Sequence, residues 1–201
     1  MGCCVIFCAG EFDAPARPLE KDDYILAADG GLRHTRKLGI EPDEIIGDFD
    51  SLGFTPPGAE VFPVEKDDTD TMAAIRHAVT VGCGEIWLYC AMGGRLDHLL
   101  GNLQAAAFAV KHGVWVRIID RETEIRVFTG GCITVPEREG WSLSVLALSD
   151  RCTGVSIHGT KYELENVTVE NSFPIGVSNQ WQGDAEISVA AGVLAVMESK
   201  M

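Results

Sequence analysis

The chain has 201 residues, of which 46% are hydrophobic and 23% are charged. This composition supports a sizeable buried core and excludes intrinsic disorder. Thirty acidic against sixteen basic residues give a formal charge of −14, which argues against nucleic acid or an anionic membrane as the main partner. An acidic protein that handles anions is expected to need a metal ion. The seven cysteines form no CxxC pair. We therefore expect reduced thiols in a cytoplasmic protein, since no membrane-length apolar segment or signal peptide is apparent.

Apolar runs alternate with helical patterns over roughly the first 118 residues. Strands are expected near residues 3–9, 24–28, 44–47, 61–64, 85–91 and 114–119. Helices are expected at 31–38, 70–81 and 98–112, the last with Asp97 as its N-cap. Because strands and helices alternate, the sheet should be largely parallel and Rossmann-like, with ligands at the carboxyl ends of its strands.

The pattern changes near Asp120, after which no helical period persists. Short β-rich runs recur at 125–129, 133–135, 143–148, 155–158, 167–169, 187–189 and 193–197. Turn-forming residues separate these runs, as is typical of an all-β sandwich. The sequence therefore predicts an α/β domain over residues 1–120 and a β-sandwich domain over 121–201.

Aspartates follow several of the predicted strands of the first domain. They are Asp29 in ADGG, Asp48 and Asp50 in GDFDS, and Asp67, Asp68 and Asp70 in KDDTDT. Residues two apart in an extended segment point to the same side, so Asp48 and Asp50 can direct two carboxylates at one point. These charges would repel each other without a cation between them, and Mg²⁺ prefers oxygen ligands. A single aspartate of this kind is more often a cap or a turn former, but three clusters at successive strand ends favour a magnesium site.

A glycine-rich segment, Gly93-Gly94-Arg95-Leu96-Asp97-His98, separates a predicted strand from a helix. Paired glycines let the backbone approach a ligand closely, and a helix N-terminus favours phosphate. Arg95 offers a planar, permanently charged group for phosphate oxygens. The plainer interpretation is that Asp97 only caps the helix and that His98 is an ordinary surface residue. The signature GxxxxGK[ST] is absent, which excludes a P-loop NTPase.

Five motifs together resemble the thiamine pyrophosphokinase family. They are ADGG (28–31), GDFDS (47–51), DDTDT (67–71), GGRLDH (93–98) and SFPIGVSN (172–179). The resemblance implies transfer of a pyrophosphoryl group from ATP to the hydroxyl of thiamine, which gives thiamine diphosphate and AMP. It also implies an α/β nucleotide-binding domain, a C-terminal β-sandwich and a homodimer whose active site is shared between subunits.

The resemblance also implies roles for individual residues. The expected ligands of Mg²⁺ are Asp48, Asp50 and Asp70. The expected ATP-binding residues are Asp29, Gly30, Gly31, Gly94, Arg95, Asp97 and His98. The expected catalytic residues are Asp67, Asp70 and Arg95. From the mechanism of the transfer, Asp67 is the candidate group that orients the alcohol or accepts its proton. The expected thiamine-binding residues are Tyr162, Ser178, Asn179 and Trp181.

Composition alone leaves the thiamine segment ambiguous, because Trp181 can be a core residue and Ser178-Asn179 an ordinary turn. Two other functions also stay open. One is a pyrophosphokinase for a different alcohol, such as a pterin, against which the VSNQW end of the second domain argues. The other is a non-catalytic nucleotide or thiamine binder, which would be expected to lose metal carboxylates, whereas this sequence keeps all of them.

Overall fold

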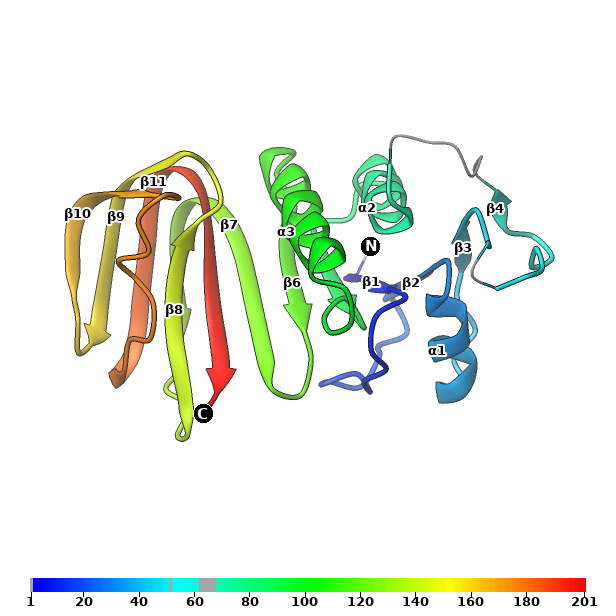
Figure 1. Cartoon of the computed structure of the whole chain (residues 1–201), viewed down its shortest axis with the longest axis horizontal. Helices are drawn as coiled ribbons and strands as arrows, with labels where there is room; N and C mark the ends of the chain where they lie inside the picture. The colour runs from blue at the N-terminus through cyan, green and yellow to red at the C-terminus, as the bar shows by residue number, and fades with distance from the viewer. Residues whose placement is uncertain (1, 51, 62–67) are drawn as a thin grey trace. The chain divides into compact units, whose positions relative to one another are not determined.

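The computed structural model describes residues 2–50, 52–61 and 68–201, and it has the mixed α/β character that the sequence predicts (Figure 1). The chain divides into two compact units, Met1–Arg121 and Glu122–Met201. Within the described residues, no helix is long and apolar enough to cross a membrane. All seven cysteines are free thiols, and only Cys132 among them is exposed.

Over its described residues, the first unit is built on a parallel sheet with three helices. Its strands are β1 (Cys4–Phe7), β2 (Tyr24–Ala28), β3 (Glu44–Gly47), β4 (Glu60–Val61), β5 (Glu85–Tyr89) and β6 (Trp115–Ile119). Its helices are α1 (Gly31–Leu38), α2 (Asp70–Thr80) and α3 (Leu96–Lys111). The strands lie in the order β6-β5-β1-β2-β3-β4, and every neighbouring pair is parallel. The predicted strand at 61–64 overlaps β4 only at Val61, since residues 62–64 lie outside the described residues.

This strand order creates a switch point between β1 and β5. From β1 the chain moves through β2 and β3 to β4 at one edge, and it then returns to β5 and β6 on the other side of β1. In open parallel sheets, ligands bind beside such a reversal, outside the carboxyl ends of the strands. The topology therefore directs attention to the segments that follow β1, β2, β3 and β5.

The two faces of this sheet are covered by different helices. Val5, Phe7 and Tyr89 share an apolar cluster with Leu38 and Ile40, at and just beyond the end of α1. Alternate strand residues point to the opposite face. On that face the hydroxyl of Tyr24 lies 3.0 Å from Nε2 of His77 in α2, and α2 in turn contacts α3.

Glycine closes α1 as predicted, because Gly39 adopts the left-handed conformation with φ of 69°. The start of α3 differs from the prediction. The helix begins at Leu96 with Arg95 in the N-cap position, and Asp97 lies in the first turn. The Asp97 carboxylate accepts hydrogen bonds from the Arg95 side chain and from the backbone N–H of His98. It therefore stabilises the first turn without capping it.

The second unit is an antiparallel arrangement of five strands. They are β7 (Thr123–Val135), β8 (Trp141–Ala147), β9 (Arg151–Thr160), β10 (Leu164–Glu170) and β11 (Trp181–Lys200). The first half of β11 pairs with β9 and the second half with β8, while β7 pairs along both halves. The inward side chains form one apolar core that includes Phe128, Leu143, Ile157 and Ile187.

Two pairs of predicted strands are single long strands in the structure, because glycine bends them without ending them. The expected runs at 125–129 and 133–135 both belong to β7, and those at 187–189 and 193–197 both belong to β11. Gly130, Gly131 and Gly192 have positive φ angles, and the β7–β11 register shifts between Val189 and Val193. A glycine inside a strand marks such a bend or bulge as often as a turn.

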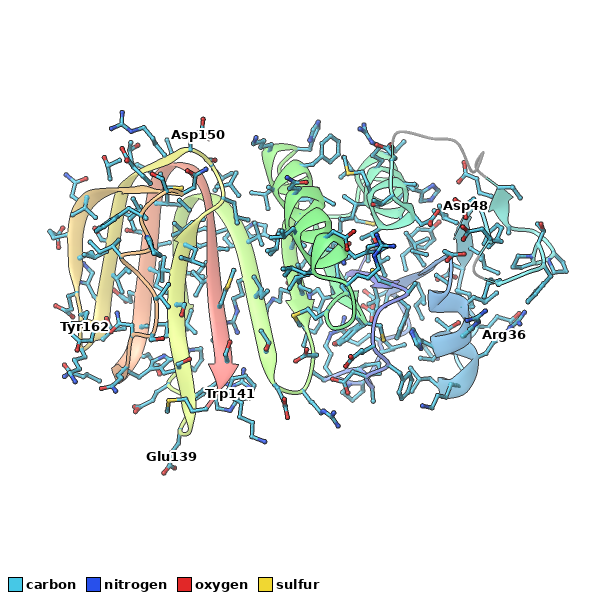
Figure 2. All side chains as sticks on the ribbon, viewed as in Figure 1. Arg36, Asp48, Glu139, Trp141, Asp150 and Tyr162 are labelled. Carbon is cyan, nitrogen blue, oxygen red and sulfur yellow. The ribbon has the colours of Figure 1, made fainter. Side chains whose placement is uncertain are left out.

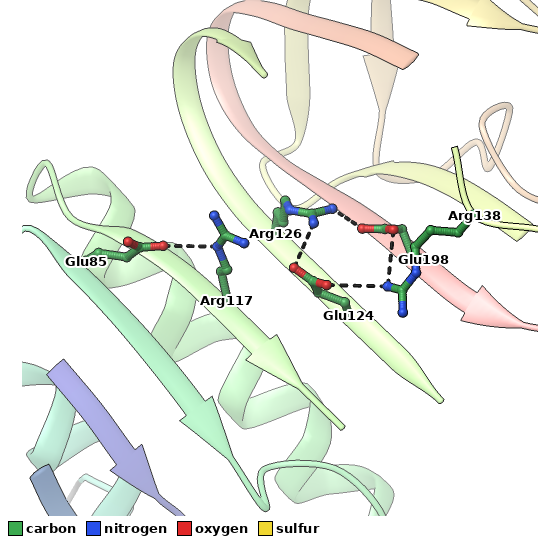
Figure 3. Close-up of polar contacts among 6 residues, drawn as sticks. All are labelled: Glu85, Arg117, Glu124, Arg126, Arg138 and Glu198. Carbon is green, nitrogen blue, oxygen red and sulfur yellow. Dashed lines mark hydrogen bonds and ion pairs between the residues drawn. The ribbon is translucent and has the colours of Figure 1, made fainter. Parts of the chain in front are cut away.

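A group of alternating charges stabilises one end of this second unit (Figure 3). Glu124 and Glu198 lie opposite each other on β7 and β11, where like charges would repel. Arg126 and Arg138 each form ion pairs with both glutamates. Because the side chain of Glu198 is fully buried, these two arginines supply the compensation that a buried carboxylate requires. In the first unit, Arg117 on β6 donates to Glu85 on β5 at 3.0 Å.

Candidate active site

Three carboxylates come together at the carboxyl edge of the first unit's sheet. Asp29, Asp48 and Asp50 each offer an oxygen atom, and these atoms lie within 4.8 Å of one another. Asp29 is buried, Asp48 is half-buried and Asp50 is exposed, so the group opens from the sheet edge toward solvent. Asp48 is labelled in Figure 2, just beyond the end of β3.

The local backbone explains this convergence. Asp29 follows β2 and Asp48 follows β3, and the register that pairs Ala28 with Ile46 brings the two strand ends side by side. The N–H of Asp29 donates to the carbonyl of Ile46 at 2.8 Å. Phe49 has a positive φ of 61° and is only 3% exposed. It is turned into the protein while the aspartates on either side of it join Asp29.

The donor set fits a divalent cation that prefers oxygen. Three carboxylates this close together repel one another unless a positive charge compensates them. Magnesium accepts a small number of carboxylates and keeps the rest of its octahedral shell for water or substrate phosphates. These residues can hold such an ion, in which case Asp29 belongs to the ligand set together with the predicted Asp48 and Asp50.

The two other predicted acidic residues have different positions. Asp70 is the first residue of α2, after Thr69, whose hydroxyl accepts from the N–H of Met72 and caps the helix. Asp70 is not a member of the three-carboxylate group. Asp67 lies outside the described residues. The metal and catalytic roles of Asp70 and the catalytic role of Asp67 therefore stay predictions.

Every residue of the glycine-rich segment after β5, from Gly93 to His98, is exposed. Gly93 has a positive φ of 80°, and a Cβ there would stand 2.5 Å from Cγ of Glu11, so this turn needs glycine. Glu11 itself is held beside the segment by its N–H, which donates to the carbonyl of Met92. The loops after β1 and β5 therefore meet at the switch point, where a ligand is expected.

Arg95 and Asp97 form a two-point pair on this exposed surface. Nε of Arg95 lies 3.1 Å from Oδ1 of Asp97, and Nη2 lies 2.5 Å from Oδ2. These hydrogen bonds and the opposite charge raise the pKa of Arg95 and lower the pKa of Asp97. The pair holds the guanidinium in one plane, with its remaining donors directed away from Asp97. His98 and Gly94 are exposed beside it.

Gly30 and Gly31, the other predicted ATP-binding positions, are buried. A Cβ on Gly31 would stand 1.9 Å from the carbonyl oxygen of Phe7, at the end of β1. This close approach lets the first turn of α1 pack directly against the sheet edge. Packing therefore explains the glycine at position 31 whether or not ATP contacts it.

The predicted thiamine segment borders a pocket of about 190 Å³ in the second unit. The pocket is lined by Ile157, Tyr162, Leu164, Ile175, Gly176, Val177 and Asn179. Tyr162 is 60% exposed and points outward at the edge of the unit, at the opposite end from Asp150 (Figure 2). Ser178 is also exposed and has a positive φ of 59°, with its N–H donating to the hydroxyl of Ser144.

The other two predicted thiamine contacts point into the protein. Asn179 is only 4% exposed, and its side chain forms hydrogen bonds with neighbouring chain segments. Trp181 packs against the apolar core of the second unit, and its indole nitrogen is buried. Trp181 is not among the residues that line the pocket.

Several residues around these sites were not singled out from the sequence. Glu11 has no motif of its own, and only the strand order places it beside Gly93. The apolar pocket residues Ile157, Leu164, Ile175 and Val177 look like ordinary strand or loop residues in the sequence. Asp29 in ADGG is one of the strand-end aspartates that favour a magnesium site, whereas the role that the family resemblance implies for it is ATP binding.

Comparison with known proteins gives this arrangement a family. Residues 16–118, just over half of the chain, match the family model described as "Thiamin pyrophosphokinase, catalytic domain". Residues 132–194 match the one described as "Thiamin pyrophosphokinase, vitamin B1 binding domain". A thiamine pyrophosphokinase of Bacillus subtilis (strain 168) is 29% identical over 184 residues, which cover 87% of this chain and 86% of that protein.

Solved structures agree with the sequence matches. A crystal structure of thiamine pyrophosphokinase from Bacillus subtilis superposes with a TM-score of 0.84 at 25% identity and covers 99% of both chains. The corresponding protein from Geobacillus thermodenitrificans gives 0.80 at 26% identity and covers 100% of this chain and 98% of its own. The protein from Candida albicans, at 15% identity, shares the fold with a TM-score of 0.75. The motifs, the two family models and these relatives together show that the chain belongs to the thiamin pyrophosphokinase family.

Proposed function

We propose that this protein transfers the pyrophosphoryl group of ATP to the hydroxyl of thiamine, which yields thiamine diphosphate and AMP. The observation that carries the proposal is the group formed by Asp29, Asp48 and Asp50 at the carboxyl edge of a parallel sheet. This group lies in the segment that matches the family's catalytic model, and a second segment matches its vitamin B1 binding model. The match to both models favours thiamine over a pterin as the acceptor and favours an enzyme over a simple binder.

In this proposal the first unit is a Rossmann-like domain that binds ATP and Mg²⁺, and the second is a β-sandwich that binds thiamine. Asp48 and Asp50, with Asp29 or Asp70, would hold Mg²⁺, which neutralises phosphate charge when it is bound. The exposed turn at Gly93 and Gly94 would admit the polyphosphate close to the backbone. Neighbouring strands of a sheet lie about 4.8 Å apart, and β1 and β2 lie between β5 and β3. An extended ligand that lies along this edge can therefore reach from the loop after β5 to the carboxylates after β2 and β3.

The reaction would proceed by in-line attack of the thiamine hydroxyl oxygen on the β-phosphorus. One P–O bond forms there while the bond from the β-phosphorus to the bridging oxygen of the α-phosphate breaks, and AMP leaves. Catalysis of such transfers depends mostly on positioning and charge neutralisation. Arg95 would face the negative charge that develops on the phosphate oxygens. Asp67 would accept the hydroxyl proton.

Thiamine is a cation with an aromatic ring, so an apolar pocket with an aromatic side chain suits it. We propose that thiamine contacts Tyr162 in the pocket of the second unit, and that Ser178, which lies in the chain between the lining residues Val177 and Asn179, contacts it from beside the pocket. The protein is further proposed to be a homodimer in which this pocket serves the metal site of the other subunit.

Incubation of the purified protein with ATP, Mg²⁺ and thiamine, followed by product identification, tests the activity. We expect AMP and thiamine diphosphate in equal amounts. Formation of ADP would show a different transfer, and tight thiamine binding without turnover would show a binding protein. Replacement of thiamine by a hydroxymethyl pterin tests the other acceptor and should give no AMP.

The shared site has its own test. An inactive Asp48→Asn chain is mixed with a chain that carries both Ser178→Ala and Asn179→Ala and binds thiamine weakly. At a thiamine concentration too low for either variant alone, the mixture should regain activity in heterodimers. At most one of the two sites in each heterodimer is repaired. Proven subunit exchange without any regained activity would refute a site shared between subunits.

A further inference from the structure

The side chain of Asn179 uses its whole hydrogen-bonding capacity inside the protein. Its Oδ1 accepts from the N–H of Tyr162 at 3.0 Å and from the N–H of Gln180 at 2.9 Å. Its Nδ2 donates to the carbonyl of Tyr162 at 2.8 Å and to the hydroxyl of Thr160 at 3.0 Å. A carboxamide has two donor hydrogens and two acceptor lone pairs, so none is left for a ligand.

These bonds connect three separate parts of the second unit. The backbone N–H and carbonyl of Asn179 pair with Leu143 on β8, at 2.7 Å and 3.2 Å. Its side chain holds the main chain of Tyr162 at both its N–H and its carbonyl, in the turn between β9 and β10. The hydroxyl of Thr160 also donates to the Tyr162 carbonyl, at 3.2 Å. Asn179 therefore fixes the place of this turn relative to β8 and to the start of β11.

The ring of Tyr162 is held much less than its backbone. The residue is 60% exposed, and it is one of the residues that line the pocket, as are Ile175 and Val177. The ammonium of Lys161 lies 5.4 Å from the ring centroid and 3.3 Å from Oε1 of Gln180. The position of an exposed ring depends on where its own Cα is fixed, and Asn179 fixes that point.

We propose that Asn179 is a positioning residue in the wall of the pocket, which makes no hydrogen bond to the ligand and acts on it by holding Tyr162 in place. This inference rests on the proposed function, since it takes thiamine as the ligand of the pocket. It changes the role expected for Asn179 from contact to support. The two roles can be told apart by combining a substitution of Asn179 with removal of the Tyr162 ring. If Asn179 acts only by positioning that ring, its substitution has no further effect on the thiamine KM once the ring is gone.

A double-mutant cycle on the thiamine KM tests this role. Tyr162→Ala keeps the backbone groups that bind Asn179 and removes the ring, and we expect a thiamine KM about fivefold higher. Asn179→Ala should give a similar increase, whereas the KM for ATP stays within about twofold. The double variant should lie within about twofold of Tyr162→Ala alone. A thiamine KM about 25-fold above that of the wild type, which is the product of the two single effects, would show that Asn179 contributes independently and would overturn the proposal.

Two further variants separate positioning from general loss of stability. Val189→Ala removes volume from the core of the same unit, where Val189 is 2% exposed, and it should leave the thiamine KM unchanged. Asn179→Asp keeps both acceptor bonds but sets a carboxylate oxygen against the carbonyl of Tyr162, so it should give a KM at least as high as that of Asn179→Ala. An increase with Val189→Ala as large as that with Asn179→Ala would contradict a specific role.

Amide hydrogen exchange gives a readout that does not depend on activity. The N–H of Tyr162 should exchange at least about tenfold faster in Asn179→Ala than in the wild type, since its acceptor is lost. Unchanged exchange there would refute the positioning role even in an active enzyme. A wild-type protein that makes no thiamine diphosphate would instead refute the proposed function. In that case, faster exchange of the Tyr162 N–H in Asn179→Ala would still show that Asn179 holds the backbone of Tyr162.

Discussion

Gly47 and Asp29 lie so close together, at the ends of β3 and β2, that a Cβ on Gly47 would stand 3.1 Å from the Cα of Asp29. The same Cβ would stand 3.2 Å from the Cβ and from the backbone nitrogen of Asp29. The absence of a side chain at position 47 therefore allows the carboxylate after β2 to meet the two carboxylates after β3. This explains the glycine of GDFDS in physical terms.

Gly47→Ala should impair the carboxylate group more than it impairs the fold. The added methyl group meets backbone atoms of Asp29, which must move by a few tenths of an ångström. We expect turnover to fall about tenfold or more, because catalytic positioning is sensitive to such shifts. The melting temperature should fall only slightly. Gly84→Ala is the matched control, since a Cβ there meets nothing within 4 Å, and it should leave turnover unchanged. Normal turnover in Gly47→Ala would show that the spacing of Asp29 does not matter.

A comparison of Asp29→Asn with Asp70→Asn should identify the third ligand of the metal. Asp29 lies within the three-carboxylate group, whereas Asp70 begins α2 outside it. Loss of one anionic ligand should weaken the apparent affinity for Mg²⁺ or Mn²⁺ about tenfold or more. We expect this loss for Asp29→Asn, as for Asp48→Asn, in metal titrations of the protein without substrates. A larger loss with Asp70→Asn would restore the ligand set that the family resemblance implies.

Most helices and strands of the first unit could be predicted, because each is marked by a pattern among residues that are close together in the sequence. Apolar runs mark β1, β2 and β5, and Gly39 ends α1 where expected. Strand order is not local, so the sequence could place Asp29, Asp48 and Asp50 at strand ends without showing that they form one group. The start of α3 was predicted at the wrong residue, since an aspartate signals both an N-cap and a first-turn ion pair.

The second unit was harder to predict for a different reason. Its long strands β7 and β11 bend at glycines, and a glycine in a β-rich run signals a bend or a turn equally well. The same ambiguity affected the predicted thiamine contacts. Ser178, Asn179 and Trp181 lie close together in sequence, yet Ser178 is exposed, Asn179 is saturated with hydrogen bonds and Trp181 packs against the core. Only the fold separates these three environments.

Arg95→Lys should be far more damaging than the conserved charge suggests. The planar guanidinium binds Asp97 through two nitrogens and keeps other donors for a ligand, whereas an ammonium cannot hold both at once. We expect the KM for ATP to rise about tenfold and kcat to fall. The pKa of Asp97, followed by NMR, should rise toward its usual range, because the Arg95 hydrogen bonds lower it. Arg36→Lys, on the exposed side of α1, is the control. Unchanged ATP kinetics in Arg95→Lys would restrict Arg95 to a structural role at the start of α3.

Glu198→Gln should destabilise the second unit strongly. The carboxylate of Glu198 is fully buried and forms ion pairs with Arg126 and Arg138 (Figure 3). Once it is replaced by a neutral amide, Glu124 is the one carboxylate of this group that still compensates the charges of the two arginines. Removal of one partner from a buried ionic group costs about 3 kcal/mol or more. Urea unfolding should show this loss. Glu186→Gln, on an exposed position of the same strand, should change the unfolding free energy by less than about 0.5 kcal/mol. Equal effects of the two substitutions would mean that the buried charges add nothing specific.

Acid should remove the contribution of Asp23 to stability within a defined pH range. Burial disfavours the charged form of this residue, but two hydrogen bonds from Arg17 and one from the N–H of Glu20 outweigh it and lower the pKa of Asp23. A lowered pKa stabilises the fold above the unfolded value, about 3.9. This stabilisation is lost as the pH falls through the lower folded value.

We therefore expect Asp23→Asn to be about 1–3 kcal/mol less stable than the wild type at pH 7, since it loses charged hydrogen bonds. This difference should persist down to about pH 5 and narrow steadily below about pH 4. Urea unfolding at several pH values measures it. Asp22→Asn, at the exposed neighbouring position, should follow the wild type throughout. A difference between Asp23→Asn and the wild type that stays constant from pH 7 to pH 3 would show that the Asp23 carboxylate is not the titrating group, because only its protonation can close the gap.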